Sequence, residues 1–573
     1  MRAGAEYFLE PDEPAHRQYE ALRAYFVEEA SAAEVADAFG YSAATVHQMA
    51  HQLRAGKAEL FRSSKPGPKG PRKAGTIRDR VLALRAADHS VSEIATALTT
   101  EGSPVSAQTV WTILDAEGIP RLGTRPRADR GATPRLAPVK ARPLPQWPPP
   151  ASIGCDHAGL FLLLPALVDL GLPGLVEQAG YPSTRVLTAW HSIGTLLLAK
   201  CARNARPSHV TALTDDPGLA LALGLTALPK ATHLTSYSYR VRRTCNTTLL
   251  AGAVGRLREL GMASGETGFN LDFHAIRHHG EDVPLENHYV PKRSQRTRSV
   301  LTFFAQDHAS TEMVYTNADV TKREAAHEVL AFADYWNRAT GTDPGLLVFD
   351  SQLTTYTVLD ELTTRGIRWL TLRQRGRTVL DRLANLPNSA WASVRIERTG
   401  RYRRPQLHEE MTRLSGIDQP VRQIAVRNIG RDHPTLLITN DLTTAAKALF
   451  ARYAERMTIE NELDAYISGF HLDALTSGLP LNVDLDTTLT VIAGNLYRLL
   501  ARNLPRYHHA TPDRIWRHFL DATGTLHLTE DTVTVDLAPR TYHPVLIDAG
   551  YDELETPIPW WNDRKLKFRF PPR

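Results

Sequence analysis

Three acidic residues occupy positions where a carboxylate could bind a metal ion. Asp272 ends the apolar run of "FNLD", Asp350 ends "LLVFD", and Glu460 lies within "RYAERMTIENELDAYISGF". Carboxylate oxygens are the hard ligands that Mg²⁺ prefers. Two acids at neighbouring strand ends, joined by a third, can hold two such ions and support phosphoryl transfer. By itself, an Asp at a strand end is usually a cap or a turn former.

The segment around Glu460 has the pattern of a half-buried helix. At 100° per residue, Tyr453, Arg456 and Glu460 form one narrow polar stripe, which Asp464 extends. Four apolar residues form a separate, buried face: Ile459, Leu463, Tyr466 and Phe470. Glu460 falls on the rim of that face, whereas Glu462 points the opposite way. We therefore expect Glu460 to face a site, and Glu455 and Glu462 to be solvated.

The elements that would position the two aspartates follow a recognisable order. Three antiparallel strands, a helix, a strand, a helix and a strand are predicted from "TGFNLDFHAI", "RSVLTFFAQDH", "EMVYTNADV", "KREAAHEVLAFADYWNRAT", "GLLVFDSQL", "TYTVLDELTTRG" and "IRWLTLRQRG". This order is the one found in ribonuclease H-like folds. In it the first and fourth strands lie side by side, which would bring Asp272 close to Asp350.

The amino-terminal part resembles a pair of helix-turn-helix units, at 1–60 and 76–122. In each, apolar residues at helical spacing flank a turn, at Gly40 in the first and at "EGSPVS" in the second. The second helix of such a unit enters a DNA major groove. Ordinary small helical hairpins would give the same pattern, but two copies joined by a basic segment favour DNA binding.

That basic linker, 61–75, is "FRSSKPGPKGPRKAG". Pro and Gly exclude helix and strand from it, and it resembles a minor-groove arm, although a solvated linker is an equal alternative. The residues expected to bind DNA there are Lys65, Lys69, Arg72 and Lys73. From position 54 to 85 the chain holds ten Lys or Arg against two acidic residues, a density that attracts phosphates.

The remaining boundaries follow changes of composition and periodicity. A Pro-rich basic linker is predicted at 123–152, a helical domain at 153–265, and the ribonuclease H-like α/β domain at 266–505 with a β-rich insertion at about 376–440. Residues 506–573 form a carboxy-terminal extension. The fold class expected is therefore a multidomain α+β protein.

Other protein classes lack their signals in this sequence. No apolar run reaches the roughly 18 residues of a membrane span, and the first residues lack the apolar core of a signal peptide, so we expect a cytoplasmic protein without a membrane partner. Cys155, Cys201 and Cys245 are far apart and are expected to be buried and inert. His278 and His279 have no partner at zinc spacing. His274, two residues after Asp272, is interpreted as a structural histidine rather than a neighbour of a metal ligand.

The stretch "LLITNDLTTAAKALFARYAERMTIENEL" resembles the glutamate-bearing segment of DDE transposases of bacterial insertion sequences. The branch concerned has the signature Tyr, two residues, Arg, three residues, Glu, six residues, Lys. Tyr453, Arg456 and Glu460 match the first three positions, while Ile467 replaces the lysine. The resemblance covers about 269–504, and Asp272 and Asp350 match the two aspartates.

This resemblance implies a function and a set of partners. Asp272, Asp350 and Glu460 would be the catalytic residues and would hold two Mg²⁺ ions, with Mn²⁺ as a possible substitute. Tyr453 and Arg456 would contact phosphates. The enzyme would cut transposon inverted-repeat ends and join the 3′-hydroxyl to target DNA, as a homodimer on paired ends in the cytoplasm at the nucleoid. A basic group nearby would contact the DNA backbone or form a solvated loop: Lys292, Arg293, Arg296 and Arg298.

Two alternative functions remain open at this level. One is a catalytically silent DNA-binding protein derived from a transposase, which the substitution at Ile467 favours slightly. The other is a metal-dependent nuclease of similar fold that lacks strand transfer. Retention of Asp272, Asp350 and Glu460 favours the active transposase.

Overall fold

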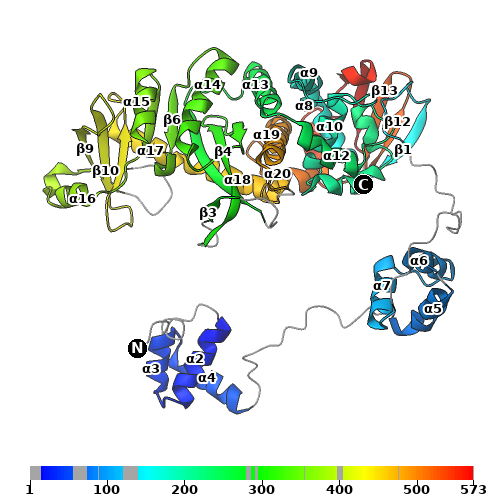
Figure 1. Cartoon of the computed structure of the whole chain (residues 1–573), viewed down its shortest axis with the longest axis horizontal. Coiled ribbons are helices and arrows are strands. Elements are labelled where there is room, and N and C mark those ends of the chain that lie inside the picture. Colours follow the sequence, from blue (N-terminus) through cyan, green and yellow to red (C-terminus); the bar gives the residue numbers. More distant parts are fainter. Residues whose placement is uncertain are drawn as a thin grey trace. The chain divides into compact units, whose positions relative to one another are not determined.

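The computed structural model divides into two units, Met1–Leu136 and Ala137–Arg573, and each is described by itself (Figure 1). The residues described are 14–55, 74–87, 89–119, 140–278, 285–290, 295–353, 355–395, 404–474 and 477–571. Six predicted DNA-binding residues lie outside these ranges: Lys65, Lys69, Arg72, Lys73, Lys292 and Arg293.

The described residues of the first unit form two clusters of three helices. They are α2 (Pro14–Phe26), α3 (Ala32–Phe39) and α4 (Ala43–Arg54), then α5 (Ala74–Ala86), α6 (Val91–Thr100) and α7 (Ala107–Ala116). Capping boxes begin α3, at Ser31 with Glu34, and α6, at Ser90 with Glu93. Each cluster has its own apolar core, and a helix precedes each predicted helix-turn-helix pair.

The second unit is built around a large mixed sheet. Its strands are β2 (Phe269–Arg277), β3 (Asn287–Val290), β4 (Gln295–Asp307), β5 (Met313–Asn317), β6 (Leu346–Phe349), β7 (Arg368–Leu372), β8 (Ala392–Ser393), β9 (Gln406–Thr412), β10 (Val421–Arg427) and β11 (Thr435–Thr439). Strands β2, β4 and β5 pair antiparallel, β6 pairs parallel with β2, and β7 pairs parallel with β6. The order β5-β4-β2-β6-β7 therefore confirms that the first and fourth predicted strands are neighbours.

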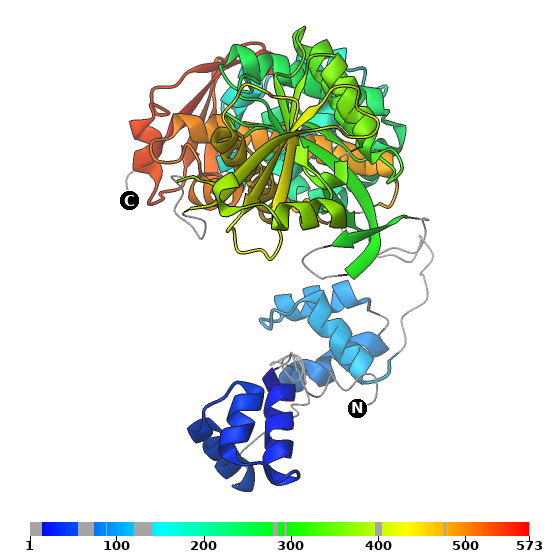
Figure 2. The same ribbon diagram turned by 90° about the vertical axis from the view of Figure 1, so that its left-hand side faces the viewer.

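The predicted β-rich insertion extends this sheet. Strand β11 pairs antiparallel with β7, and β10, β9 and β8 follow in order. Helix α16 (Arg377–Ala384) covers one face through Leu383, and α17 (Ala446–Glu455) covers the other through Leu449 and Phe450. Figure 2 looks at this end of the unit, with the strands in yellow and helices on both sides. The β3–β4 hairpin was not predicted.

Helices cover the rest of the large sheet. They are α14 (Glu328–Thr340), α15 (Tyr356–Thr364) and α18 (Met457–Phe470). Helix α14 packs its aromatic side chains on the core face of β2, where the rings of Trp336 and Phe269 are 4.4 Å apart. Because side chains alternate along a strand, Asp272 lies on the opposite face from Phe269 and Leu271.

Two domain boundaries placed from the sequence divide a single sheet. A second sheet has the order β1-β12-β13-β15-β14. Strand β1 (Ala151–Cys155) precedes the helical region, while the others follow position 505: β12 (Gly524–Leu528), β13 (Thr532–Leu537), β14 (Thr556–Ile558) and β15 (Arg564–Arg569). The boundaries at 153 and 505 were therefore wrong as limits of separate domains, because sequence periodicity does not show which distant strands pair.

The remaining described α-helices also belong to the second unit. They are α8 (Leu164–Asp169), α9 (Leu172–Gln178), α10 (Ala189–Cys201), α11 (Thr211–Thr214), α12 (Ala231–Tyr237), α13 (Arg243–Glu259), α19 (Pro480–Asn503), α20 (Pro512–Ile515) and α21 (His543–Asp548). Within the described residues, no single helix is long and apolar enough to cross a membrane. Two consecutive helical segments with a bend between them, Ala158–Asp169 and Leu172–Gln178, meet the length and composition requirement only when they are taken together.

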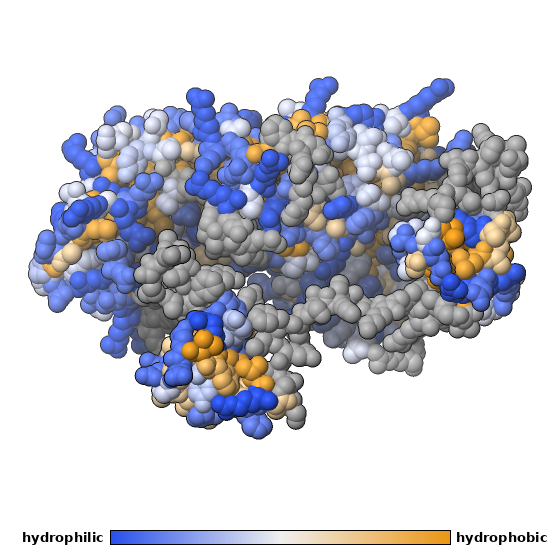
Figure 3. All heavy atoms as spheres, turned by 60° about the horizontal axis from the view of Figure 1, so that its bottom comes forward, coloured by the Kyte–Doolittle hydropathy of each residue, from blue (hydrophilic) through white to orange (hydrophobic). Residues whose placement is uncertain are grey.

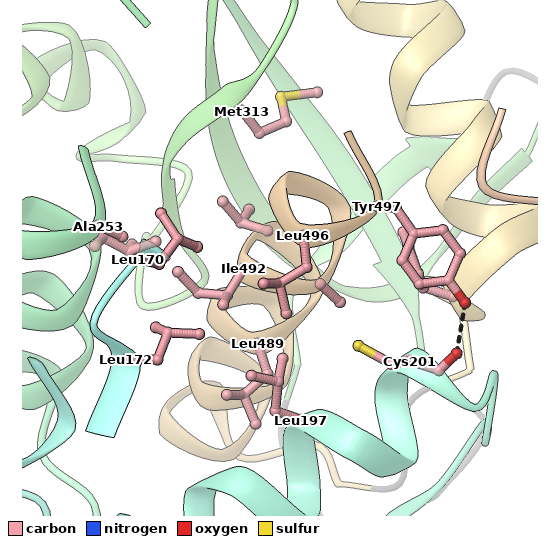
Figure 4. Close-up of a cluster of buried hydrophobic side chains, with 14 of the residues drawn as sticks. Leu170, Leu172, Leu197, Cys201, Ala253, Met313, Leu489, Ile492, Leu496 and Tyr497 are labelled. Atoms are coloured by element: carbon pink, nitrogen blue, oxygen red, sulfur yellow. Dashed lines mark hydrogen bonds between the residues drawn. The ribbon is translucent and has the colours of Figure 1, made fainter. Parts of the chain in front are cut away.

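Helix α19 links the large sheet to the helical region. It packs against β5 and against α10 and α13, and its apolar side chains Leu489, Ile492 and Leu496 lie at the centre of the core (Figure 4). The Tyr497 hydroxyl donates a hydrogen bond to the Cys201 carbonyl at 2.6 Å. All three cysteines are buried, as predicted.

Candidate active site

Asp272 and Asp350 lie at the same edge of the large sheet, on neighbouring strands. The parallel pair β2 and β6 is in register up to Leu271 and Phe349, and the next residue of each strand is the aspartate. Adjacent strands are about 4.8 Å apart. Gly268 permits this close pairing: its φ is +84°, and a Cβ there would lie 2.3 Å from the Leu346 carbonyl oxygen of β6. The predicted proximity of the two aspartates is therefore built into the sheet.

Arg456 connects Asp272 to Glu460. Its Nη1 donates to Asp272 Oδ2 at 3.2 Å, and its Nη2 donates to Glu460 Oε1 at 2.8 Å. The guanidinium side chain is only 7% exposed, compared with 19% for Asp272 and 41% for Glu460. The helix predicted to run unbroken through Arg452–Phe470 is interrupted here, because α17 ends and α18 begins at Arg456. The polar stripe nevertheless survives, with Arg456 against the Tyr453 ring at 5.9 Å.

The electrostatics of the site show that the three acids influence one another. Burial raises the pKa of Asp272 to about 6; the charges of Glu460 and Asp350 add to the rise, and Arg456 opposes it. The same acids raise the pKa of Arg456, against the effect of its burial. Concentrated negative charge of this kind is neutralised by a cation, here Arg456.

The donor set fits a hard divalent ion, since all three candidate ligands are carboxylates. Among the described residues, no three acidic, His or Cys side chains stand close enough to bind one ion together, and Arg456 lies between Asp272 and Glu460. Asp272 and Asp350 are adjacent without any rearrangement. For Glu460 to share an ion with them, the Arg456 guanidinium, which is hydrogen-bonded to both Asp272 and Glu460, must turn aside.

Helix α18 is fixed in place by close packing against α19. The predicted apolar face is confirmed, because Ile459, Leu463, Tyr466 and Phe470 are all buried. A Cβ at Gly494 of α19 would lie 2.0 Å from the Tyr466 hydroxyl, so only glycine permits this approach. The end of α18 is held by Arg203, which donates to the carbonyls of residues 468 and 469.

The prediction that Glu462 is solvated was wrong, whereas Glu455 is 41% exposed and agrees with its prediction. Glu462 is 15% exposed and its Oε2 lies 2.9 Å from Nη2 of Arg498 on α19, which is 14% exposed. Glu455 Oε2 lies 2.9 Å from His308 Nε2. The helical angle placed both residues away from the apolar face, but α19 brings Arg498 to Glu462, and His308, directly after β4, lies beside Glu455. Ile467, at the lysine position of the signature, packs against the core.

A buried polar cluster beside Asp272 was not predicted. Arg452 Nη1 donates to Asn270 Oδ1 at 2.7 Å, and the Asn270 amide donates to Thr458 and Gln306. These contacts join β2 and β4 to the junction of α17 and α18. A polar residue inside the apolar run "FNLD", two positions before Asp272, was the available signal.

Two basic residues of the loop predicted to contact the DNA backbone lie within the described ranges. Arg296 and Arg298 are exposed on β4, in the β3–β4 hairpin. In the amino-terminal unit, the outer face of α4 carries exposed His47, His51 and Arg54. Figure 3 shows hydrophilic side chains over most of the visible face and small apolar patches on both three-helix clusters.

His274 is half-buried on β2, two residues after Asp272.

Comparison with known proteins gave no match: no protein-family model matches the chain, and no curated protein does.

Proposed function

We propose that this protein is a DNA transposase of the DDE type, which cuts transposon ends and joins the freed 3′-hydroxyl to target DNA. The observation that carries the proposal is the convergence of Asp272, Asp350 and Glu460 around one arginine. The strand order β5-β4-β2-β6-β7 supports it, because it is the order of ribonuclease H-like folds. In this proposal the protein acts in the cytoplasm on nucleoid DNA.

In this site Asp272, Asp350 and Glu460 would together hold two Mg²⁺ ions. Two such ions stabilise the charge that develops on the attacking and leaving oxygens of a phosphodiester. Before substrate arrives, Arg456 shields Asp272 from Glu460. Once it turns toward solvent, its planar guanidinium can bind a DNA phosphate in a bidentate manner, with Tyr453 packed against it.

DNA recognition is assigned to the two three-helix clusters. In each, a capped helix is followed by a turn and a second helix, α4 or α7, that would enter a major groove. The linker residues Lys65, Lys69, Arg72 and Lys73 would follow the backbone between them. Two such clusters suit the repeated ends of an insertion element, which a homodimer would pair.

The test is incubation of the full chain with Mg²⁺ and labelled duplexes containing the sequences that flank its gene, followed by mapping of nicks and joined products. We expect cleavage at the element ends, followed by strand transfer, and loss of both in Asp272→Ala, Asp350→Ala and Glu460→Ala with DNA binding nearly intact. Cleavage without joining would instead indicate the metal-dependent nuclease. Binding without any cleavage would indicate the silent DNA-binding protein.

A further inference from the structure

A pocket of about 310 Å³ opens next to the candidate active site, at the same edge of the large sheet. One of the residues that line it, Ser351, directly follows Asp350 in the sequence, and the Ser351 amide donates a hydrogen bond to Asp350 Oδ1 at 2.5 Å. The opposite wall comes from the loop after β7 and the start of β11. Continuing the β6–β7 register places Asp350 beside Leu372, which pairs with Leu437 of β11. At about 4.8 Å per strand, the pocket lies roughly 5 to 10 Å from Asp350.

The charge of this pocket is positive. Arg373, Arg375 and Arg431 line it, and none of its described lining residues is acidic. Arg373 Nη1 donates to Gln423 Oε1 at 2.5 Å, which anchors that guanidinium at the wall. Arg375 and Arg431 are exposed, and within the described ranges neither has a carboxylate partner. Two guanidinium groups are thus available for an anion.

A buried hydroxyl gives a second, independent indication of a ligand. Thr435 lines the pocket, is 9% exposed, and its Oγ1 makes no hydrogen bond to the described part of the chain. A buried polar atom without a partner destabilises the folded state. A rotation that brings this hydroxyl to a polar ligand in the pocket would relieve that destabilisation.

The lining selects the chemical class of the ligand. None of the described residues that line the pocket is aromatic, so the pocket offers no ring on which a nucleic-acid base could stack. Guanidinium groups together with a hydroxyl suit phosphate oxygens.

We propose that this pocket binds a backbone phosphate of the DNA strand that passes Asp350. At the separation given by the strand spacing, this phosphate would lie close to the scissile one along the same strand. This inference rests on the proposed function and deepens it, because the pocket would hold the DNA strand through contacts that do not involve the metal ligands.

The first test compares the full-length Arg375→Gln/Arg431→Gln variant with Arg377→Gln. Arg377 is 95% exposed on α16, close in sequence but outside the pocket, and serves as a control for altered charge. Binding of a fluorescein-labelled 30-base-pair duplex carrying the gene-flanking sequence is measured in EDTA over a range of salt concentrations. We expect at least a tenfold weaker Kd for the double variant and a salt slope reduced by about 1 to 2, with the control unchanged. Equal affinities for the double variant and the control would overturn the proposal.

The second test is Thr435→Val, which removes the hydroxyl at constant shape. We expect DNA binding to weaken severalfold while the melting temperature stays the same or rises, because a buried polar atom without a partner is lost. Unchanged binding, or a lowered melting temperature, would show that the hydroxyl has a structural role and would count against the proposal.

Failure of this inference can be separated from failure of the proposed function. Binding in EDTA needs no cleavage, so weakened binding by the pocket variants supports the pocket even if Mg²⁺ produces no nicks. If the wild type cleaves DNA and the pocket variants bind DNA as well as the wild type does, only the proposal about the pocket is overturned. Absence of duplex binding by the wild type at low salt overturns both.

Discussion

Glu460 and Glu462 are two residues apart and chemically identical, yet the structure predicts opposite consequences of replacing them with alanine. Glu462 forms a largely buried ion pair with Arg498, whereas Glu460 is 41% exposed and pairs with Arg456. Glu462→Ala leaves Arg498 without its partner at a site that is 14% exposed. Removing one member of a buried pair costs about 3 to 5 kcal/mol. Burial raises the pKa of Glu462, which shows that the carboxylate itself is costly to bury, so we expect the lower end of that range, about 3 kcal/mol.

Glu460→Ala should behave in the reverse manner. Arg456 is buried but Glu460 is the exposed member of this i,i+4 pair, so we expect the loss of the pair to cost about 1 kcal/mol. Arg456 also keeps its contact with Asp272. We therefore expect Glu460→Ala to remain nearly as stable as the wild type and to lose cleavage.

Urea unfolding of both variants, together with Mg²⁺-dependent cleavage normalised to the folded fraction, measures the two effects separately. A double variant, Glu462→Leu/Arg498→Leu, should recover much of the lost stability, because no unpaired charge remains. The reasoning is refuted if Glu462→Ala unfolds at the same urea concentration as Glu460→Ala. It is refuted equally if Glu462→Ala abolishes cleavage per folded molecule while Glu460→Ala retains it.

Three further predictions concern other parts of the molecule. The raised pKa of Asp272, about 6 against an ordinary value near 3.8, means that its proton stabilises the fold below about pH 4 and that this contribution is lost as pH rises through 6. Asp272→Asn should therefore stabilise the protein by about 2 to 3 kcal/mol at pH 7.5 and by almost nothing at pH 4; an equal effect at both pH values in urea titrations would contradict this. Residues 1–136 alone should bind duplex DNA with an affinity that falls steeply with salt, and a flat salt dependence in anisotropy would indicate a protein-binding module. Gly494→Ala should displace Tyr466 and α18, lowering both the melting temperature and cleavage, while Gly255→Ala, which meets no neighbour within 4 Å, should not.

The parts of the site predicted correctly from the sequence were those set by local pattern. Apolar runs ending in Asp272 and Asp350 identified two strand ends, and their predicted order implied that they are neighbours. The 3.6-residue period identified the buried face of α18. The inference about the aspartates depends on a strand order for which there are few alternative folds. The inference about α18 depends only on the spacing of residues within one helix.

What the sequence did not reveal depends on long-range packing. The partner of Glu462 is Arg498, thirty-six residues further on, and the helical angle alone cannot show that α19 reaches that face. The pairing of β1 with β12 joins residues that lie 369 to 377 positions apart. Arg456 was predicted to contact phosphates, and its bridge between Asp272 and Glu460 became visible only once both carboxylates had been positioned.

The central claim is that Asp272, Asp350 and Glu460 form one metal site. Replacing Mg²⁺ with Fe²⁺ and generating hydroxyl radicals at the bound ion cuts the polypeptide next to its ligands. We predict cuts near positions 272, 350 and 460 in the same molecules, which excess Mg²⁺ suppresses and Asp272→Ala abolishes. Cuts confined to other segments, or cuts at these positions that persist in Asp272→Ala, would contradict the claim.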